Sequence, residues 1–308
     1  MITLSVAICT RDRADSLQRT LLSLARSQAA LTTAHASSWE LLVVDNGSSD
    51  PTATVIESFT GRLPLTQVSE PREGPSNARN TAFTLFRGQW IAFIDDDAEV
   101  DVDYLSALLR AIAANPRMDF FGGRSRVNWL TGEPHWLGNP DLPYIKGLLC
   151  NFDEGETDRE MSPDDPLPFG VNMGMRRALV AQIAPFRSDL GPGTPARGED
   201  TEYLRRALEA GFRGFYLGSV GVRHRGDPAR FRLAALYRHG IAKGLGNRIM
   251  DPSSADRGSL AVEAWQLLGA LWQALKGKGD WMRVCIVNAG IQRGLRHRLD
   301  GAQRRSIN

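Results

Sequence analysis

Three short apolar runs, each ending in a polar cluster, most constrain the fold of this chain. Residues 4–9 (LSVAIC), 40–45 (ELLVVD) and 90–95 (WIAFID) have the composition of buried parallel strands. Residues 63–70 (LPLTQVSE) predict a further strand between the last two. Apolar residues at helical spacing separate these runs, so strands and helices alternate. This order predicts an α/β fold with a mostly parallel central sheet, right-handed crossovers and flanking helices.

Two helix ends can also be predicted. An apolar stripe at helical spacing follows the first strand, and Asp15 is expected to cap that helix. Residues 74–88 predict a second helix, which Gly88 should end and in which Leu85 should face inward.

Composition and charge limit the classes of function. With 308 residues, 42% of them hydrophobic and 23% charged, the chain is expected to fold as a globular protein with a large core. A net charge of +2 predicts no nucleic-acid partner. Cys9, Cys150 and Cys285 match no metal or redox spacing, which indicates a reducing compartment and a cytoplasmic protein. The first residues fit a strand rather than a signal peptide, and no uncharged stretch is long enough to span a bilayer.

The charge is unevenly distributed, and this predicts a boundary near residues 251–259. Residues 257–308 carry nine basic and three acidic side chains, or +6, whereas residues 1–256 carry 28 and 32, or −4. We therefore expect a main domain over 1–256 and a basic, amphipathic helical tail over 257–308.

Two apolar stripes mark the tail as helical. One contains Trp265, Leu268 and Trp272, and the other lies over residues 284–295. The stripes suit packing on the main domain, on a second copy of the chain, or peripheral attachment to the anionic inner face of a membrane. A Pro-rich, acidic stretch over 139–168 is expected to be an irregular loop, either a lid or simply exposed.

Polar clusters follow three of the predicted strands, at residues 9–13 (CTRDR), 45–50 (DNGSSD) and 95–97 (DDD). In open α/β sheets, ligands bind beyond the carboxyl ends of the strands. The three clusters are therefore expected to meet in one binding site.

The acidic triplet of Asp95, Asp96 and Asp97 concentrates negative charge directly after a buried run. One interpretation is a helix N-cap with solvated loop charges. The other is a site for a divalent cation, Mn2+ or Mg2+, which would leave coordination positions open for a substrate diphosphate. The two neighbouring polar clusters favour the cation. The chain has neither a P-loop nor a G-x-G-x-x-G after a strand, so a glycine-loop phosphate site is not expected.

Six blocks of the sequence, taken in order, resemble the family 2 glycosyltransferases. They are SVAICTRDR (5–13), LLVVDNGSSD (41–50), EGPSNARN (73–80), FIDDDAEV (93–100), PFGVNMGMRR (168–177) and GEDTEYLRRALEAG (198–211). The resemblance implies a Rossmann-like GT-A fold and inverting transfer of a sugar from a nucleotide diphosphate sugar to an acceptor hydroxyl. It also implies a nucleotide-sugar half over about 1–125 and an acceptor half over about 126–256. The Q-x-x-R-W block of processive members is absent, so one sugar per encounter is expected.

The same resemblance assigns roles to single residues. The nucleotide sugar would be bound by seven residues at the predicted edge of the sheet: Thr10, Arg11, Asp45, Asn46, Arg79, Asp95 and Asp96. The cation would be held by Asp97, with Asp95 and His224 as further ligands. Asn46 stands where many members have Asp, so the nucleotide base stays open. Arg79 as a solvated helix charge and His224 as a structural histidine also stay open.

Inversion by direct displacement requires a carboxylate that takes the proton of the acceptor hydroxyl. Glu199 and Asp200 begin a predicted helix, where acids also complement the helix dipole. Their match to the family's ED block favours Asp200 as the general base and Glu199 as an orienting or acceptor-binding residue.

Two other functions stay open at this point. A Mg2+-dependent phosphotransferase would also use an aspartate cluster, but it would usually place its nucleophilic Asp after the first strand, where this chain has CTRDR. A catalytically silent nucleotide-sugar binding protein would not need the GED block. As a glycosyltransferase, the chain would act in polysaccharide, glycolipid or other glycoconjugate biosynthesis, on a glycan, a lipid-linked sugar or a small molecule.

Overall fold

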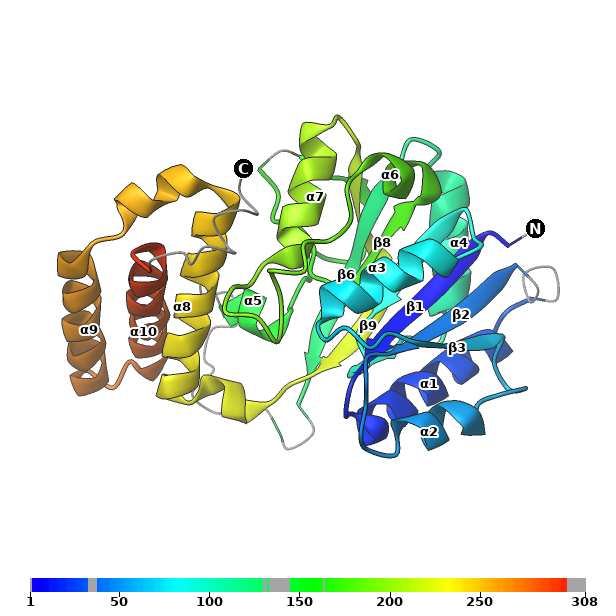
Figure 1. Ribbon diagram of the computed structural model, residues 1–308, viewed down its shortest axis with the longest axis horizontal. Coiled ribbons are helices and arrows are strands. Elements are labelled where there is room, and N and C mark those ends of the chain that lie inside the picture. Colours follow the sequence, from blue (N-terminus) through cyan, green and yellow to red (C-terminus); the bar gives the residue numbers. More distant parts are fainter. Residues whose placement is uncertain (1, 33–37, 130–131, 133–144, 163, 298–308) are drawn as a thin grey trace. The chain divides into compact units, whose positions relative to one another are not determined.

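The computed structural model describes residues 2–32, 38–129, 132, 145–162 and 164–297. The chain forms two compact units (Figure 1). Unit 1 comprises residues 1–128, 150–187 and 200–225, and unit 2 comprises residues 129–149, 188–199 and 226–308.

A nine-stranded sheet forms the centre of unit 1, in the order β3-β2-β1-β4-β8-β6-β9-β5, with β7 paired to β9 (Figure 1). The strands are β1 (Leu4–Thr10), β2 (Trp39–Asp45), β3 (Leu65–Ser69), β4 (Trp90–Ile94), β5 (Ala98–Val100), β6 (Phe120–Asn128), β7 (Arg159–Glu160), β8 (Asn172–Arg176) and β9 (Gly214–Arg225). The first four strands in this order are parallel, whereas β8 is antiparallel to β4 and β6. The predicted α/β fold is confirmed.

Helices cover both faces of the sheet. They are α1 (Ala14–Ala29), α2 (Thr52–Ser58), α3 (Pro75–Leu85), α4 (Tyr104–Ala114), α6 (Arg177–Gln182) and α7 (Glu199–Glu209). Alternate residues of β1 belong to two core clusters, as the two-residue period of a strand requires. Leu21 of α1 and Leu108 of α4 join one cluster, and Ala78 of α3 and Leu204 of α7 join the other. The fold therefore has three layers, with the carboxyl ends of β1, β2 and β4 at one edge.

The two predicted helix ends are wrong. Asp15 lies inside the first turn of α1, and Asp50 caps it instead, because its Oδ2 accepts the first backbone N–H of the helix at 2.9 Å. Helix α3 ends at Leu85 rather than Gly88, because the backbone becomes extended at Phe86 and this ring is buried. Leu85 is 46% exposed, not inward-facing.

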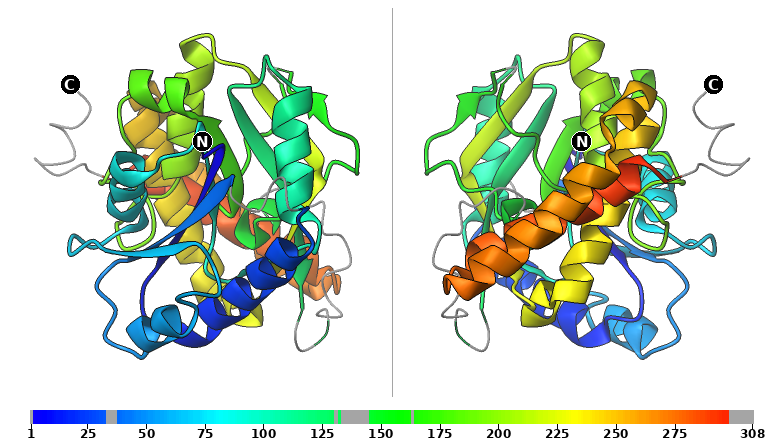
Figure 2. Two further views of the ribbon diagram at one scale, coloured as in Figure 1. Left: turned by 90° about the vertical axis from the view of Figure 1, so that its right-hand side faces the viewer. Right: turned by 90° about the vertical axis from the view of Figure 1, so that its left-hand side faces the viewer.

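Unit 2 is mainly helical. It contains α5 (Ile145–Leu149), η1 (Pro228–Phe231), α8 (Leu233–Met250), η2 (Pro252–Arg257), α9 (Leu260–Leu275) and α10 (Gly279–Leu295). α10 packs against both α8 and α9 and lies between them (Figures 1 and 2). The boundary expected near residues 251–259 coincides with η2, and the assignment of 1–256 and 257–308 to separate domains stays a prediction. Among the described residues, no helix is both long and apolar enough to cross a membrane.

The contact between α8 and α10 is made by glycines. Gly240 and Gly244 of α8 face Gly290 and Gly294 of α10, and a Cβ on any of them would collide with a backbone carbonyl oxygen of the other helix. The two helices therefore approach at backbone distance. The sequence did not suggest α8, because small residues rather than an apolar stripe form its contact face.

The predicted loop over 139–168 is only partly described. Its residues 139–144 and 163 lie outside the described residues. The described part includes α5 and the short strand β7, with irregular backbone between them.

Candidate active site

The predicted polar clusters of the first and fourth strands meet at the carboxyl edge of the sheet. Thr10 at the end of β1 is paired in register with Asp45 at the end of β2. The Thr10 hydroxyl donates a hydrogen bond of 2.8 Å to Oδ2 of Asp96, just beyond β4. Both side chains are buried. Parallel pairing of β2, β1 and β4 therefore assembles one site from three distant segments.

Asp95, Asp97 and His224 form a cluster that could hold a metal ion, with one ligand atom from each within 4.8 Å of the others. Strand pairing brings them together, since Ala98 of β5 is opposite His224 of β9 and the backbone N–H of Arg225 donates to the Asp97 carbonyl at 3.0 Å. Two carboxylates and an imidazole are a ligand set suited to Mn2+ or Mg2+, with the imidazole favouring a transition metal. The sequence predicted these three residues as the metal ligands, and the structure places them side by side.

Two arginines form ion pairs with the carboxylates of the acidic triplet. Arg13 Nη1 donates to Oδ1 of Asp96 at 3.1 Å and to Oδ2 of Asp97 at 2.8 Å. Arg79 Nη2 lies 3.7 Å from Oδ1 of Asp95. Arg79 is 6% exposed, so it is not a solvated helix charge. Arg13 was not among the predicted site residues, although its place in the first polar cluster was a signal for it.

Burial is the main influence on the pKa values of Asp95 and Asp96. Desolvation raises the pKa of Asp96 to about 7, although Arg13 acts in the opposite direction. Desolvation likewise raises the pKa of Asp95 above its ordinary range, against the charge of Arg79. Asp95 and Asp96 are therefore held in surroundings that disfavour their charged form.

Asp200 is connected to the same site through one glycine. Its Oδ2 accepts the backbone N–H of Gly170 at 2.9 Å, and its Oδ1 accepts that of Thr201 at 2.7 Å. A Cβ on Gly170 would collide with the guanidinium of Arg79, so this backbone lies directly against the arginine that faces Asp95. Contacts through Arg79 and Gly170 thus connect Asp95 of the metal-binding cluster to the predicted base within unit 1.

Glu199, although adjacent in sequence to Asp200, belongs to unit 2. It is buried, and its carboxylate lies against Gly191, whose φ of +108° favours glycine. Only Asp200 of the predicted pair is therefore placed in the unit that holds the acidic triplet.

Asn46 braces a loop. Its Nδ2 donates to the carbonyl oxygens of Glu70 and Arg72, at 2.8 and 2.7 Å, and its Oδ1 accepts the Gly74 N–H at 2.8 Å. Both amide hydrogens are used, which leaves a lone pair of Oδ1 for any further contact. The predicted contact of Asn46 with a nucleotide stays a prediction.

Arg11 and Asp45 flank the same region. Arg11 Nη2 donates to Oε1 of Glu73 at 2.7 Å, on the loop that Asn46 braces. Asp45 Oδ1 accepts the Ser48 N–H at 2.9 Å. Their predicted roles in nucleotide binding also stay predictions.

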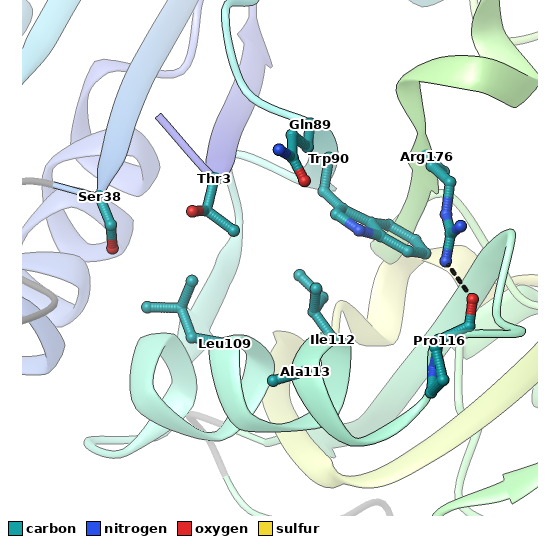
Figure 3. A pocket seen from close by; sticks show the side chains of 9 residues that line it. All are labelled: Thr3, Ser38, Gln89, Trp90, Leu109, Ile112, Ala113, Pro116 and Arg176. Carbon is teal, nitrogen blue, oxygen red and sulfur yellow. Dashed lines mark hydrogen bonds between the residues drawn. The ribbon is translucent and has the colours of Figure 1, made fainter. Parts of the chain in front are cut away.

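A separate cavity of about 470 Å³ lies at the opposite edge of the sheet (Figure 3). It is lined at the amino ends of β1 and β4, where Thr3 and Trp90 lie, and by α4. Arg176 lies over the Trp90 ring and donates to the Pro116 carbonyl oxygen at 2.8 Å. None of its nine lining residues is a carboxylate or a histidine, so the cavity lacks a candidate base or metal ligand.

The fold is an α/β sheet with a candidate metal site at its acidic edge, and comparisons with known proteins identify the class. A family model described as Glycosyl transferase family 2 matches residues 5–184, more than half of the chain. The chain therefore belongs to glycosyl transferase family 2. It is a glycosyltransferase with a GT-A fold.

Individual relatives are similar along most of their length. Glycosyltransferase AglE of Haloferax volcanii is 25% identical over 269 residues, which cover 87% of this chain and 81% of the relative. A glucosyl-dolichyl phosphate glucuronosyltransferase of the same organism is 24% identical, with 82% and 79% covered. Among solved structures, the mannosyltransferase PcManGT from Pyrobaculum calidifontis, in complex with GDP-Man and Mn2+, has a TM-score of 0.61. It is 18% identical and covers 94% of this chain and 86% of its own, which shows a shared fold.

Proposed function

We propose that the chain is an inverting, non-processive glycosyltransferase that binds a nucleotide diphosphate sugar with a divalent cation and uses Asp200 as general base. The observation that carries the proposal is the short connection from the Asp95, Asp97 and His224 cluster, through Arg79 and Gly170, to Asp200. A cation site and a candidate base beside each other are what displacement of a nucleoside diphosphate requires.

In this proposal, Asp97, Asp95 and His224 hold Mn2+ or Mg2+, which would neutralise the diphosphate and make it a better leaving group. The ligand set fits either ion, and a protein of the same fold was solved with Mn2+. Arg79 and Arg13 supply fixed positive charge beside the same carboxylates, where a diphosphate would lie.

The donor would lie along the carboxyl edge of β2, β1 and β4. Thr10, Arg11, Asp45 and Asn46 would border the nucleotide, and Asp96 would contact the sugar nucleotide from its fixed position beside Thr10. The GDP-Man bound by PcManGT supports a nucleotide sugar as donor.

The chemical step would be a single displacement. Asp200 takes the proton of the acceptor hydroxyl as its oxygen forms a bond to the anomeric carbon of the donor. The bond from that carbon to the phosphate oxygen breaks, and its electron pair leaves with the nucleoside diphosphate. Attack from the face opposite the leaving group inverts the anomeric configuration. Glu199 would then act as an acceptor-binding or orienting residue.

For the acceptor, we propose a sugar linked to a polyprenyl phosphate lipid. The glucosyl-dolichyl phosphate glucuronosyltransferase is named for such an acceptor, and it is similar over 82% of this chain. The enzyme would then act at the inner face of a membrane, attached peripherally through residues 257–308. Their charge of +6 would favour anionic lipid. The alternative to membrane attachment is that residues 257–308 bind a second copy of the chain.

The test is release of nucleoside diphosphate from a panel of nucleotide sugars, with Mn2+ or Mg2+ and with polyprenyl-phosphate, glycan or small-molecule acceptors. Acceptor-dependent release with an inverted product supports the proposal. Phosphate transferred to the acceptor would instead indicate a phosphotransferase. Tight donor binding without release, for every acceptor, would indicate a silent binding protein.

A further inference from the structure

Helix α9 exposes an apolar face. Among the described residues, eight large apolar side chains of this helix are exposed. Six of them are more than half exposed and lie on one side of the helix, and we call these the α9 face: Leu260, Trp265, Leu268, Leu271, Trp272 and Leu275. Trp265 and Leu268 are 68% and 67% exposed, and Leu275 is 75% exposed. A contiguous apolar patch of this kind marks an interaction site, because single exposed apolar residues are common but clusters are not.

The opposite side of α9 is turned inward, where Glu263 and Ala270 are buried. Glu263 is buried, forms an ion pair with Arg296 of α10, and accepts from the Tyr237 hydroxyl at 2.6 Å. The backbone N–H of Ser259, which caps α9, donates to Oε1 of Gln292 at 2.9 Å. A buried carboxylate needs these partners. They therefore fix the rotation of α9 that leaves its apolar side uncovered.

We infer that the α9 face docks on a lipid bilayer containing anionic lipids, with the helix lying in the interface of one leaflet. The inference extends the proposed attachment from the charge of the tail to one defined surface, and it does not depend on the chemistry proposed for Asp200.

The distribution of charge and tryptophan favours a bilayer as the occupant. Glu263 is the one charged residue of α9, and it is buried, so the α9 face itself is uncharged. Two lysines, Lys276 and Lys278, follow directly at its end and are exposed, and Lys276 Nζ lies 4.6 Å from the ring centre of Trp272. Tryptophan at the level of the headgroups, with lysine reaching toward anionic lipid, is typical of interfacial helices.

The length of α9 agrees with this orientation. Its 16 residues span about 24 Å at 1.5 Å per residue, less than the roughly 30 Å hydrocarbon core. The apolar side chains occupy one side of the helix rather than its whole circumference, which suits an orientation parallel to the bilayer surface.

The experiment compares the full-length protein with the triple variant Trp265→Gln, Leu268→Gln, Trp272→Gln in co-sedimentation with phosphatidylcholine vesicles, with and without phosphatidylglycerol. Burial of one large apolar side chain in the bilayer raises the binding affinity roughly tenfold. The triple variant should therefore bind vesicles at least about 100-fold more weakly than the wild type. Replacing Lys276 and Lys278 with Gln should weaken binding to anionic vesicles by roughly fivefold per lysine and change binding to neutral vesicles little.

Two controls separate this result from other causes. The variant Leu85→Gln, Val102→Gln removes exposed apolar residues of unit 1 and should leave vesicle binding unchanged. Donor hydrolysis in detergent should be the same for the triple variant as for the wild type, so loss of vesicle binding is distinguishable from failure of the proposed chemistry.

Quenching by lipids brominated on the acyl chains provides a direct reading of depth. The chain has seven tryptophans, and most of the quenching should be lost when Trp265 and Trp272 are both replaced by Phe, with the remainder due to Trp281, which is 45% exposed. Unchanged vesicle binding of the triple variant overturns the inference. So does a wild-type dimer that the triple variant converts to a monomer while vesicle binding persists, because the α9 face would then belong to a second copy.

Discussion

Nε2 of His224 lies 3.3 Å from Oδ1 of Asp97, and strand pairing enforces this distance. Ala98, the residue after Asp97, is opposite His224 in the antiparallel pair of β5 and β9. A short strand of three residues thus fixes the acidic triplet to the far part of the sheet. The candidate metal site is consequently a property of the sheet register and not of a loop alone.

The first prediction concerns the cation. Asp97→Ala removes a carboxylate from the cluster, so transfer should fall by a factor on the order of 10² to 10³ or more, since several kcal/mol of charge stabilisation would be lost. Affinity for nucleoside diphosphate should weaken in the presence of Mn2+ and change little in its absence. Isothermal titration with and without the metal checks this.

A matched control is Asp103→Ala, which removes an acid that makes no side-chain cap bond to α4. It should leave transfer and metal-dependent binding at wild-type levels. EDTA should abolish activity and added Mn2+ or Mg2+ should restore it. Full activity in EDTA would refute the metal requirement.

The second prediction concerns the base. Asp200→Asn keeps the size of the side chain and its acceptor oxygen toward Gly170, but it cannot take a proton. Turnover should fall by a factor on the order of 10² to 10⁴, while affinity for donor and metal stays within about twofold. Initial rates and calorimetry on the same preparation provide both numbers.

The alternative is that Asp200 only complements the start of α7. The variant would then lose at most about 1 kcal/mol of stability and keep nearly normal turnover. Glu199→Gln should have a smaller effect than Asp200→Asn. The reverse order would move the base to Glu199.

The third prediction uses the glycine contact of α8 and α10. Gly290→Ala should destabilise the protein by about 1–3 kcal/mol, because the new Cβ would collide with the carbonyl oxygen of Tyr237. Gly269→Ala on α9 is the control, since its Cβ would meet only Cys285 Sγ, at 3.6 Å. There the higher helix propensity of alanine should add up to about 1 kcal/mol. Urea unfolding of both variants tests this, and equal stabilisation would contradict the described packing.

The fourth prediction concerns pH. Burial, with the charges of Arg197, Lys243 and Arg230, lowers the pKa of His239 to about 4 from an ordinary 6.5. The unfolded chain therefore binds a proton as the pH falls below 6.5, and the folded chain does not. The contribution of His239 to the free energy of unfolding is therefore constant above pH 6.5. It decreases as the pH falls from 6.5 toward 4, by about 2 kcal/mol at pH 5.

His239→Gln should remove this part of the pH dependence. The free energy of unfolding, measured in urea at pH 7 and pH 5, should fall by about 2 kcal/mol less in the variant than in the wild type. His297→Gln, at an exposed position, is the control. Identical pH dependence of wild type and His239→Gln would show that other groups are responsible.

The sequence revealed the part of the fold that depends on local pattern. The runs that became β1, β2 and β4 are mostly apolar because both faces are covered, and the acids after them marked the edge with the site. The antiparallel strand β8 and helix α8 were not predicted. The place of β8 in the sheet depends on its pairing with β4 and β6. The packing of α8 depends on its glycine contacts with α10.

Tertiary partners also decided what the site residues do. Asn46 was visible as a polar residue after a strand, but its role as a brace depends on where the 70–74 loop passes. The apolar stripe of α9 was visible too. Which side of that helix is buried depends on Arg296, which becomes the partner of Glu263 only when α9 and α10 pack.

Asp96 is held at three points: Thr10 and Arg13 each bind one carboxylate oxygen, and the Thr20 hydroxyl donates to its backbone carbonyl at 3.0 Å. Rotational freedom of this side chain is therefore lost when the chain folds and not when a ligand arrives. In the proposed complex, a donor that meets Asp96 would find the geometry of this side chain already set, so donor binding would not have to pay the entropy of ordering it. Part of the donor affinity would thus be determined by α1, which carries Thr20 on its buried side.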